Sequence, residues 1–256
     1  MGEGGRGGEG QQGEPGSKDE PEEPEYSRFK LMNILGIITA RGGSRGIPRK
    51  NIKLLGGKPL LAYTIEATQQ SKLKKFVVST DDAEISQCAK EFAVEVIHRP
   101  NELAKDNTPT LPVLQHVLTS ISQEYDAIMI LQPTSPFRTC EDINNSIELF
   151  ENDPQADSLV SVMEIPHNMS PCSAMELSNG YLFNYQKNSD IILKRQDKPK
   201  CYARNGAIYI SKSNLVLQKQ SIIGKDCLAY IMPKERSLDI DEPYDWKLAE
   251  FLLDNS

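Results

Sequence analysis

The sequence predicts an α/β protein with a mostly parallel sheet and helices on both faces. Short apolar runs typical of buried strands recur along the chain, at residues 34–39, 75–80, 94–98, 127–132, 158–163, 206–211 and 228–232. Helix-like patterns separate many of these runs, at residues 59–71, 82–93, 110–123, 140–151 and 242–254. Strands and helices in alternation favour parallel strands joined by crossover helices.

Two segments depart from this alternation. Residues 1–30 are dominated by Gly, Glu, Pro and Gln. They cannot bury enough apolar surface to offset the entropy of ordering, so we expect a disordered tail and one domain over residues 31–256. Residues 165–203 are polar, with scattered aromatic side chains, and we interpret them as an excursion from the sheet.

Composition narrows the class of protein. The net charge of −7 over 256 residues argues against a nucleic-acid binder, so local cations serve a local purpose. No apolar run approaches the ~18 residues of a membrane span, and the N-terminus lacks the apolar stretch of a secretory signal. The five cysteines are widely spaced and odd in number, which indicates reduced thiols in a cytoplasmic protein.

The loop at residues 40–51 carries the strongest chemical signal. It follows a predicted buried strand, and its three glycines allow the backbone to approach a ligand closely. Its four cations, Arg41, Arg45, Arg49 and Lys50, suit a triphosphate. A solvated basic turn is the alternative, which the glycine spacing and the preceding strand disfavour. The loop matches neither the dinucleotide fingerprint nor the P-loop pattern.

Two aspartates near the C-terminus form a second candidate site. Asp239 and Asp241 are separated by one residue, so an extended backbone would direct both carboxylates to one side. Mg²⁺ prefers such oxygen ligands and shares its shell with phosphates. The alternative is a pair of turn or capping residues before the helix at 242–254. In combination with the loop, we favour the Mg²⁺ site, and we assign Asp245 to the first turn of that helix.

The fold prediction places these segments together. Ligands of such sheets bind beyond the carboxyl ends of the strands, where residues 40–51, 132–138 and 239–241 would lie. Gln132 ends a predicted strand and carries both a donor and an acceptor for a substrate, although it could instead satisfy nearby backbone. We expect Arg138 to pair with Asp142, and Asp82 to cap the following helix.

Four blocks resemble the acylneuraminate cytidylyltransferase family, whose members make CMP-activated nonulosonic acids. The loop at 40–51 is similar to A-R-x-x-S-K-G-x-x-x-K-N, with Arg45 where lysine is usual. The blocks at 131–139, 205–210 and 237–243 follow in the family's order. The resemblance implies a three-layer Rossmann-like nucleotidyltransferase fold. It also implies that residues 165–203 form a protruding dimerisation arm and that the protein is a homodimer.

The resemblance also implies a reaction, in which CTP and a nonulosonic acid give the CMP-sugar and pyrophosphate with Mg²⁺. Arg41, Lys50 and Asp241 are then the catalytic candidates, and Asp239 with Asp241 would hold the metal. The implied CTP-binding set is Ala40, Arg41, Gly42, Gly43, Ser44, Lys50, Asn51, Arg99 and Thr110. The implied acceptor-binding set is Gln132, Arg195 and Tyr209.

The acceptor half departs from the sialate-type members. Ile222 and Ile223 stand where those members tend to have aromatic residues, and Arg204 precedes Asn205 where an Arg-Pro pair is usual. The run at 168–171, Asn-Met-Ser-Pro, resembles the legionaminic-acid branch. Two alternatives stay open: another sugar nucleotidyltransferase such as a CMP-Kdo synthetase, and an inactive nucleotide-binding or scaffold module.

Overall fold

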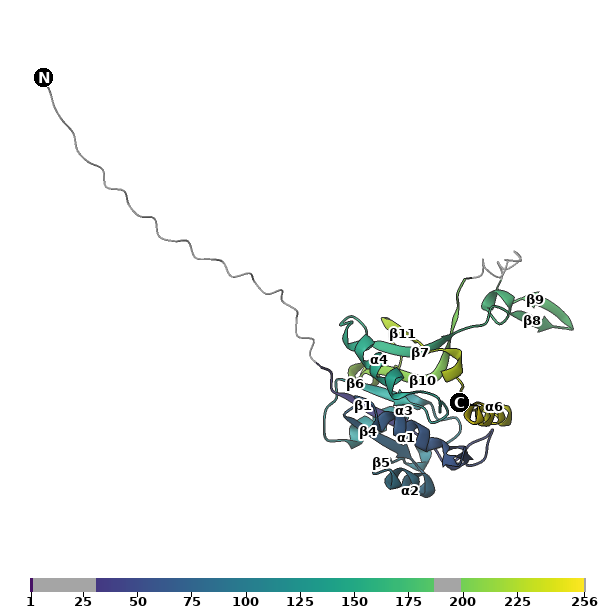
Figure 1. Ribbon diagram of the computed structural model, residues 1–256, viewed down its shortest axis with the longest axis horizontal. Coiled ribbons are helices and arrows are strands. Elements are labelled where there is room, and N and C mark those ends of the chain that lie inside the picture. Colours follow the sequence, from purple (N-terminus) through teal and green to yellow (C-terminus); the bar gives the residue numbers. More distant parts are fainter. Residues whose placement is uncertain (2–30, 187–198, 256) are drawn as a thin grey trace. The chain divides into compact units, whose positions relative to one another are not determined.

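A seven-stranded sheet forms the centre of the protein (Figure 1). The computed structural model describes Met1, residues 31–186 and residues 199–255, and residues 31–256 constitute one unit. The strand order is β11-β7-β10-β6-β1-β4-β5. The strands are β1 (Ile34–Thr39), β4 (Lys75–Thr80), β5 (Glu95–His98), β6 (Ala127–Leu131), β7 (Ser158–Glu164), β10 (Tyr202–Lys212) and β11 (Cys227–Ile231). β10 is antiparallel to β6 and β7, and the other neighbours are parallel, which confirms the mostly parallel sheet.

The helices cover both faces of this sheet. The five predicted ones are present as α1 (Leu60–Gln69), α2 (Ala83–Glu91), α3 (Thr110–Ser120), α4 (Cys140–Glu151) and α6 (Pro243–Asp254). The prediction missed α5 (Ser213–Leu217), whose five residues are too few to display a helical period. No helix in the described part of the chain combines the length and the apolar character that crossing a bilayer requires.

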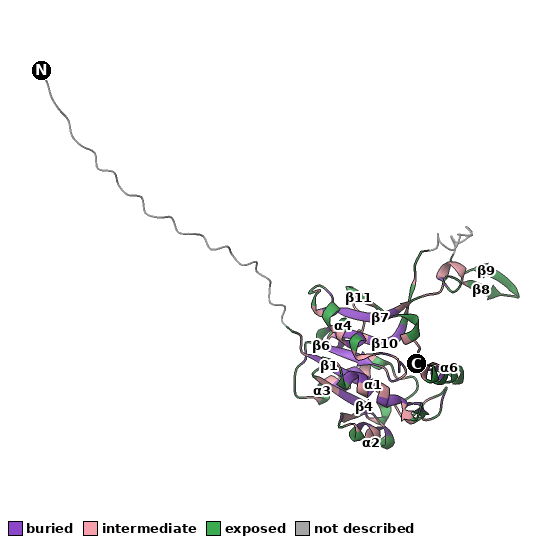
Figure 2. Cartoon of the chain, viewed as in Figure 1, coloured by how far each residue is buried: buried purple, intermediate pink, exposed green. Residues whose placement is uncertain are grey.

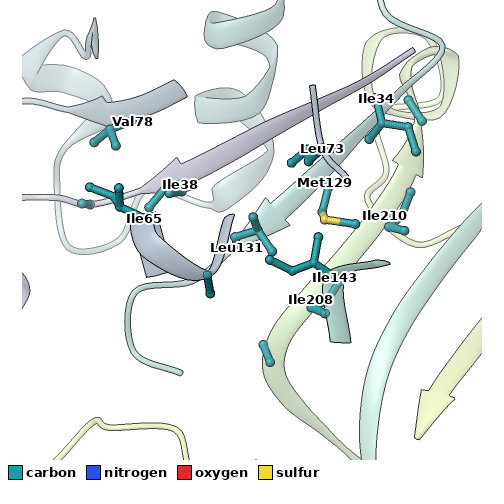
Figure 3. Packing of buried hydrophobic residues seen from close by; sticks show 14 of the residues in the cluster. Ile34, Ile38, Ile65, Leu73, Val78, Met129, Leu131, Ile143, Ile208 and Ile210 are labelled. Atoms are coloured by element: carbon teal, nitrogen blue, oxygen red, sulfur yellow. The ribbon is translucent and has the colours of Figure 1, made fainter. Parts of the chain in front are cut away.

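Alternating strand residues build one core on each face. Ile38 and Val78 face a cluster that includes apolar side chains of α1, α2 and α4, part of which Figure 3 displays. Their neighbours Ile37 and Val77 face the opposite cluster, with side chains of α3 and α5. This is the period of two that a pleated strand imposes, and it makes the sheet the middle of three layers.

A third, smaller cluster lies between the cationic loop, the start of α1 and α6. It joins Ile47 of the cationic loop to Ile240, the residue between the two aspartates, and both are buried. It also contains Leu60 of α1, Trp246 and Ala249 of α6, and Leu55 of a short hairpin formed by β2 (Leu54–Leu55) and β3 (Lys58–Pro59). The loop at 40–51 and residues 239–241, here called the acidic segment, share this cluster. Apolar packing therefore holds together two segments that lie far apart in the sequence.

The excursion at 165–203 contains a second hairpin. Strands β8 (Met175–Ser178) and β9 (Tyr181–Asn184) pair with each other, not with the seven-stranded sheet. All eight of their residues are exposed, in contrast to the central strands β1 and β6, which are almost entirely buried (Figure 2). The predictions of a disordered tail over 1–30 and of a role for Arg195 fall outside the described residues.

Candidate active site

A cleft of about 300 Å³ opens at the carboxyl ends of the central strands. Thr39 ends β1, Arg99 follows β5 and Gln132 follows β6, so three strands deliver a side chain to it. It is lined by Thr39, Arg41, Gly43, Ser44, Lys50, Asn51, Arg99, Leu103, Lys105, Asp106, Thr108, Thr110, Val113, Gln132, Pro133 and Thr134. Eight of these belong to the predicted site: Arg41, Gly43, Ser44, Lys50, Asn51, Arg99, Thr110 and Gln132.

Lys50 connects the cleft with the acidic segment. Its ammonium donates to the carbonyl oxygen of Ile240 at 2.7 Å and to Oδ1 of Asp241 at 2.9 Å. The lysine is 9% exposed, whereas the Asp241 side chain is 70% exposed. Gly46 makes the approach possible, because a Cβ at that position would lie 2.1 Å from the carbonyl oxygen of Asp241. The structure thus brings Lys50 and Asp241, 191 residues apart, into contact.

The loop itself is held by hydrogen bonds. Asn51 Nδ2 donates to the carbonyl oxygen of Arg41 at 3.0 Å, and this hydrogen bond fixes the two ends of the loop to each other. The Arg41 guanidinium donates to Oδ1 of Asp106 at 2.6 Å. Gly43 and Ser44 lie at the cleft surface between these anchors.

Two predicted members of the loop face elsewhere. Ala40 is fully buried, and its amide donates to the carbonyl oxygen of Ser79 in β4. The Gly42 amide donates to Oδ1 of Asp81 at 3.2 Å, and a Cβ on Gly42 would lie 2.6 Å from Asp82. In this structure the amide of Gly42 is therefore engaged by Asp81, and the assignment of Gly42 to the CTP-binding set stays a prediction. Gly42 is required by its close approach to the start of α2.

Asp239 is half-buried and lies beside Gln132. A Cβ on Gly206 would lie 3.0 Å from Oδ2 of Asp239 and 3.4 Å from Oε1 of Gln132, so the carboxylate and the amide are neighbours. Gly206 has φ of 77°, a left-handed conformation that suits glycine, at the point where the register of β10 against β7 shifts. Because Gly206 has no side chain, the carboxylate of Asp239 can occupy the space next to it.

The electrostatics of Asp239 are unusual. Its Oδ1 is buried without a hydrogen-bond partner, and burial, with a contribution from the charge of Asp241, raises the pKa of its carboxyl. A buried carboxylate oxygen without a hydrogen-bond partner, within electrostatic reach of the carboxylate of Asp241, suits a divalent cation. Among the described residues, no cluster of three or more His, Cys, Asp or Glu side chains has metal-binding geometry. Phosphate oxygens would have to complete the shell of any such ion.

Other predicted acids are structural. Asp82 accepts from the backbone amides of Glu84 and Ile85 and caps α2, as predicted, and it also pairs with Arg49. Asp245 accepts from the amides of Asp241 and Glu242 and so closes the first turn of α6. This hydrogen bond also orients the backbone that carries Asp241.

The predicted pair of Arg138 with Asp142 is wrong. Arg138 is buried and donates to the carbonyl oxygens of Ala207 at 2.7 Å and Gln132 at 3.2 Å. Burial lowers the pKa of this guanidinium to about 9. Asp142 instead receives two hydrogen bonds from Arg236, at 3.0 Å and 2.8 Å. Sequence spacing favoured the near neighbour, whereas the fold brings a partner from 94 residues away.

The remaining predicted residues differ in location. Arg99 is 4% exposed and donates to the carbonyl oxygen of Ser79, and burial lowers the pKa of its guanidinium. Thr110 is the first residue of α3 and lines the cleft. Tyr209 packs against the core under α3 and α5, and burial raises the pKa of its phenol. It does not line the cleft.

Sequence reasoning missed the segment between β5 and α3 as a cleft wall. Lys105, Asp106 and Thr108 line the cleft there. Their position between Arg99 and Thr110, both assigned to the site, was the available signal. Thr134 was missed as well, although it lies within a block that indicated the family.

Comparisons with known proteins agree with this geometry. The family model described as cytidylyltransferase matches residues 35–244. An N-acylneuraminate cytidylyltransferase of Escherichia coli is 36% identical over 84% of this chain, which spans 51% of that protein. A CMP-N,N'-diacetyllegionaminic acid synthase of Legionella pneumophila is 34% identical over 87% of this chain and 97% of that protein.

A solved structure supports the fold. A CMP:2-keto-3-deoxy-manno-octonic acid synthetase complexed with CTP superposes with a TM-score of 0.67 at 19% identity, over 87% of this chain and 98% of that one. This likeness concerns the arrangement of strands and helices alone. Together with the matched family model and the 34% identical relative, it leads to one conclusion: the chain belongs to the cytidylyltransferase family.

Proposed function

We propose that this protein transfers CMP from CTP to the anomeric hydroxyl of a nonulosonic acid. The anomeric oxygen attacks the α-phosphorus, a new P–O bond forms, and the bond to the β-phosphate breaks. The electron pair of the broken bond leaves with pyrophosphate, and the hydroxyl proton is lost. Such a reaction asks the protein chiefly to position the reactants and to neutralise developing charge.

The residues of the cleft suit this task. Arg41 and Lys50 would neutralise the β- and γ-phosphates and the departing pyrophosphate, with the backbone at Gly43 and the hydroxyl of Ser44 alongside. Asp239 and Asp241 would hold Mg²⁺, which supplies charge neutralisation to the phosphates when bound. Arg99 and Thr110, which also line the cleft, would contact the cytidine, and Gln132 would face the acceptor.

The observation that carries the proposal is the contact of Lys50 with Asp241 and the Ile240 carbonyl at the edge of the cleft. The test is pyrophosphate release with Mg²⁺ and CTP against N-acetylneuraminate, diacetyllegionaminate and Kdo. We expect release with a nonulosonic acid, and a loss of about 10²–10³-fold in Lys50→Ala and in Asp241→Ala. Lys58→Ala is the matched control, because Lys58 pairs with Glu66 outside the cleft. Release with Kdo alone, or unchanged rates in Lys50→Ala, would contradict the proposal.

Two relatives that this chain matches over 97% and 96% of their length are named CMP-N,N'-diacetyllegionaminic acid synthase, and together with the run at 168–171 they support an acceptor of the legionaminate type. We further propose a homodimer in which the β8–β9 hairpin reaches the partner subunit. Its exposed Leu177, Tyr181 and Phe183 are 55% or more accessible in the single chain. Sedimentation should give a dimer, and the double variant Leu177→Ser with Phe183→Ser should give a monomer.

We also propose that the protein resides in the cytoplasm. Its five cysteines are all free, which suits a reducing compartment.

A further inference from the structure

Each of the four cations of the loop at 40–51 has a carboxylate partner. Arg49 pairs with Asp82 and Glu84, which do not line the cleft. Lys50 pairs with Asp241 at the acidic segment. Arg41 and Arg45 share one carboxylate, that of Asp106. Both Asp106 and Arg41 line the cleft, so this ion pair occupies the region that the proposed function assigns to phosphates.

The Asp106 carboxylate engages the two arginines separately. Its Oδ1 accepts from Nη1 of Arg41 at 2.6 Å, and its Oδ2 accepts from Nε of Arg45 at 2.7 Å. These hydrogen bonds lower the pKa of Asp106, so it is ionised at neutral pH. The two arginines thus bind the carboxylate oxygens of Asp106 with the same N–H donors that would bind the oxygens of a phosphate group.

The ion pairs of Asp106 with Arg41 and Arg45 stabilise no helix or strand. The side chain of Asp106 is 43% exposed and lies on an irregular segment between η2 (Asn101–Leu103) and α3. Within the described part of the chain, the hydrogen bonds to its carboxylate come from the two loop arginines. Asp82, by contrast, caps α2 through two backbone amides. Asp106 therefore contributes a charge to the cleft and no helix cap.

We propose that Asp106 is an internal counter-anion, which the β- and γ-phosphates of CTP displace from Arg41 and Arg45 and which returns as pyrophosphate leaves. The inference rests on the proposed function. An N–H of Arg41 cannot serve the carboxylate and a phosphate at full strength together, and the two anions repel each other. Asp106 therefore weakens binding of CTP and pyrophosphate, and leaves CMP unaffected because CMP has no phosphate at that position.

Titration calorimetry on the full chain with Mg²⁺ tests this, with CTP, pyrophosphate and CMP as ligands. Asp106→Asn should tighten CTP and pyrophosphate about three- to tenfold, the scale expected for removing two partly exposed ion pairs. The affinity for CMP should not change. Glu84→Gln is the matched control: it removes the same charge from a partner of Arg49, outside the cleft, and should change none of the three affinities.

Equal or weaker binding of CTP by Asp106→Asn would overturn the inference, and weaker binding would show that Asp106 positions the arginines for the substrate instead. Asp106→Ser, whose side chain is smaller, must agree with Asp106→Asn. Arg41→Ala separates the two claims. If Arg41→Ala and Lys50→Ala leave CTP binding unchanged, the proposed function itself fails. If they weaken it while Asp106→Asn has no effect, the counter-anion alone is rejected.

Discussion

Gly46→Ala tests the contact between the cationic loop and the acidic segment. The added Cβ would lie 2.1 Å from the carbonyl oxygen of Asp241, and ordinary contact begins near 3.4 Å, so the segments must separate by about 1.3 Å. Both belong to the cluster built on Ile47 and Ile240, whose packing resists such a shift. Misplacement on the order of 1 Å can cost about 10²-fold in rate, and overpacking costs about 1–3 kcal/mol of stability.

We therefore expect kcat/KM for pyrophosphate release to fall about 100-fold in Gly46→Ala, with a higher Mg²⁺ requirement and a lower thermal midpoint. Gly43→Ala is the control for folding. Its added Cβ meets nothing within 4 Å, and neither glycine has a positive φ. That variant should match or slightly exceed the wild-type midpoint, by up to about 1 kcal/mol. Wild-type activity and stability in Gly46→Ala would refute the close approach of the loop to Asp241.

Two further variants address buried charges. Asp239→Asn should abolish turnover and yet raise the thermal midpoint at pH 7 without Mg²⁺. Burial raises the pKa of Asp239, so its charged form destabilises the wild-type fold once the pH is above the ordinary carboxyl range. The increase in thermal midpoint that Asp239→Asn gives over the wild type should therefore vanish near pH 4, where the carboxyl of the unfolded chain is also protonated. A lower midpoint at pH 7 would contradict this. Arg236→Met should destabilise by about 2–3 kcal/mol in denaturant titrations, since it leaves the carboxylate of Asp142 buried and unpaired. Lys200→Ala, which breaks an exposed pair with Glu164, should cost less than about 0.5 kcal/mol, and equal costs would refute the argument.

Local sequence patterns were sufficient to predict most of the strands and helices and two segments of the candidate site. Strand β6 is a continuous apolar run, and Asp82 caps α2 as predicted. Such signals lie within a few residues of each other, so a single segment reveals them. The glycine-rich cationic loop and the Asp239–Asp241 pair were also visible, since the chemistry of each resides in adjacent residues.

The tertiary structure alone decided how these segments meet. It placed β10 antiparallel between β6 and β7, assigned Arg236 to Asp142, and brought Asp106 to Arg41 across 65 residues. These contacts depend on the shared cores and on loop closure over long separations, which no local period encodes. Local sequence patterns identified most of the helices and strands and about half of the residues that line the cleft. Only packing of the whole chain decided which charge faces which, because a charged side chain takes the partner that the fold brings within reach.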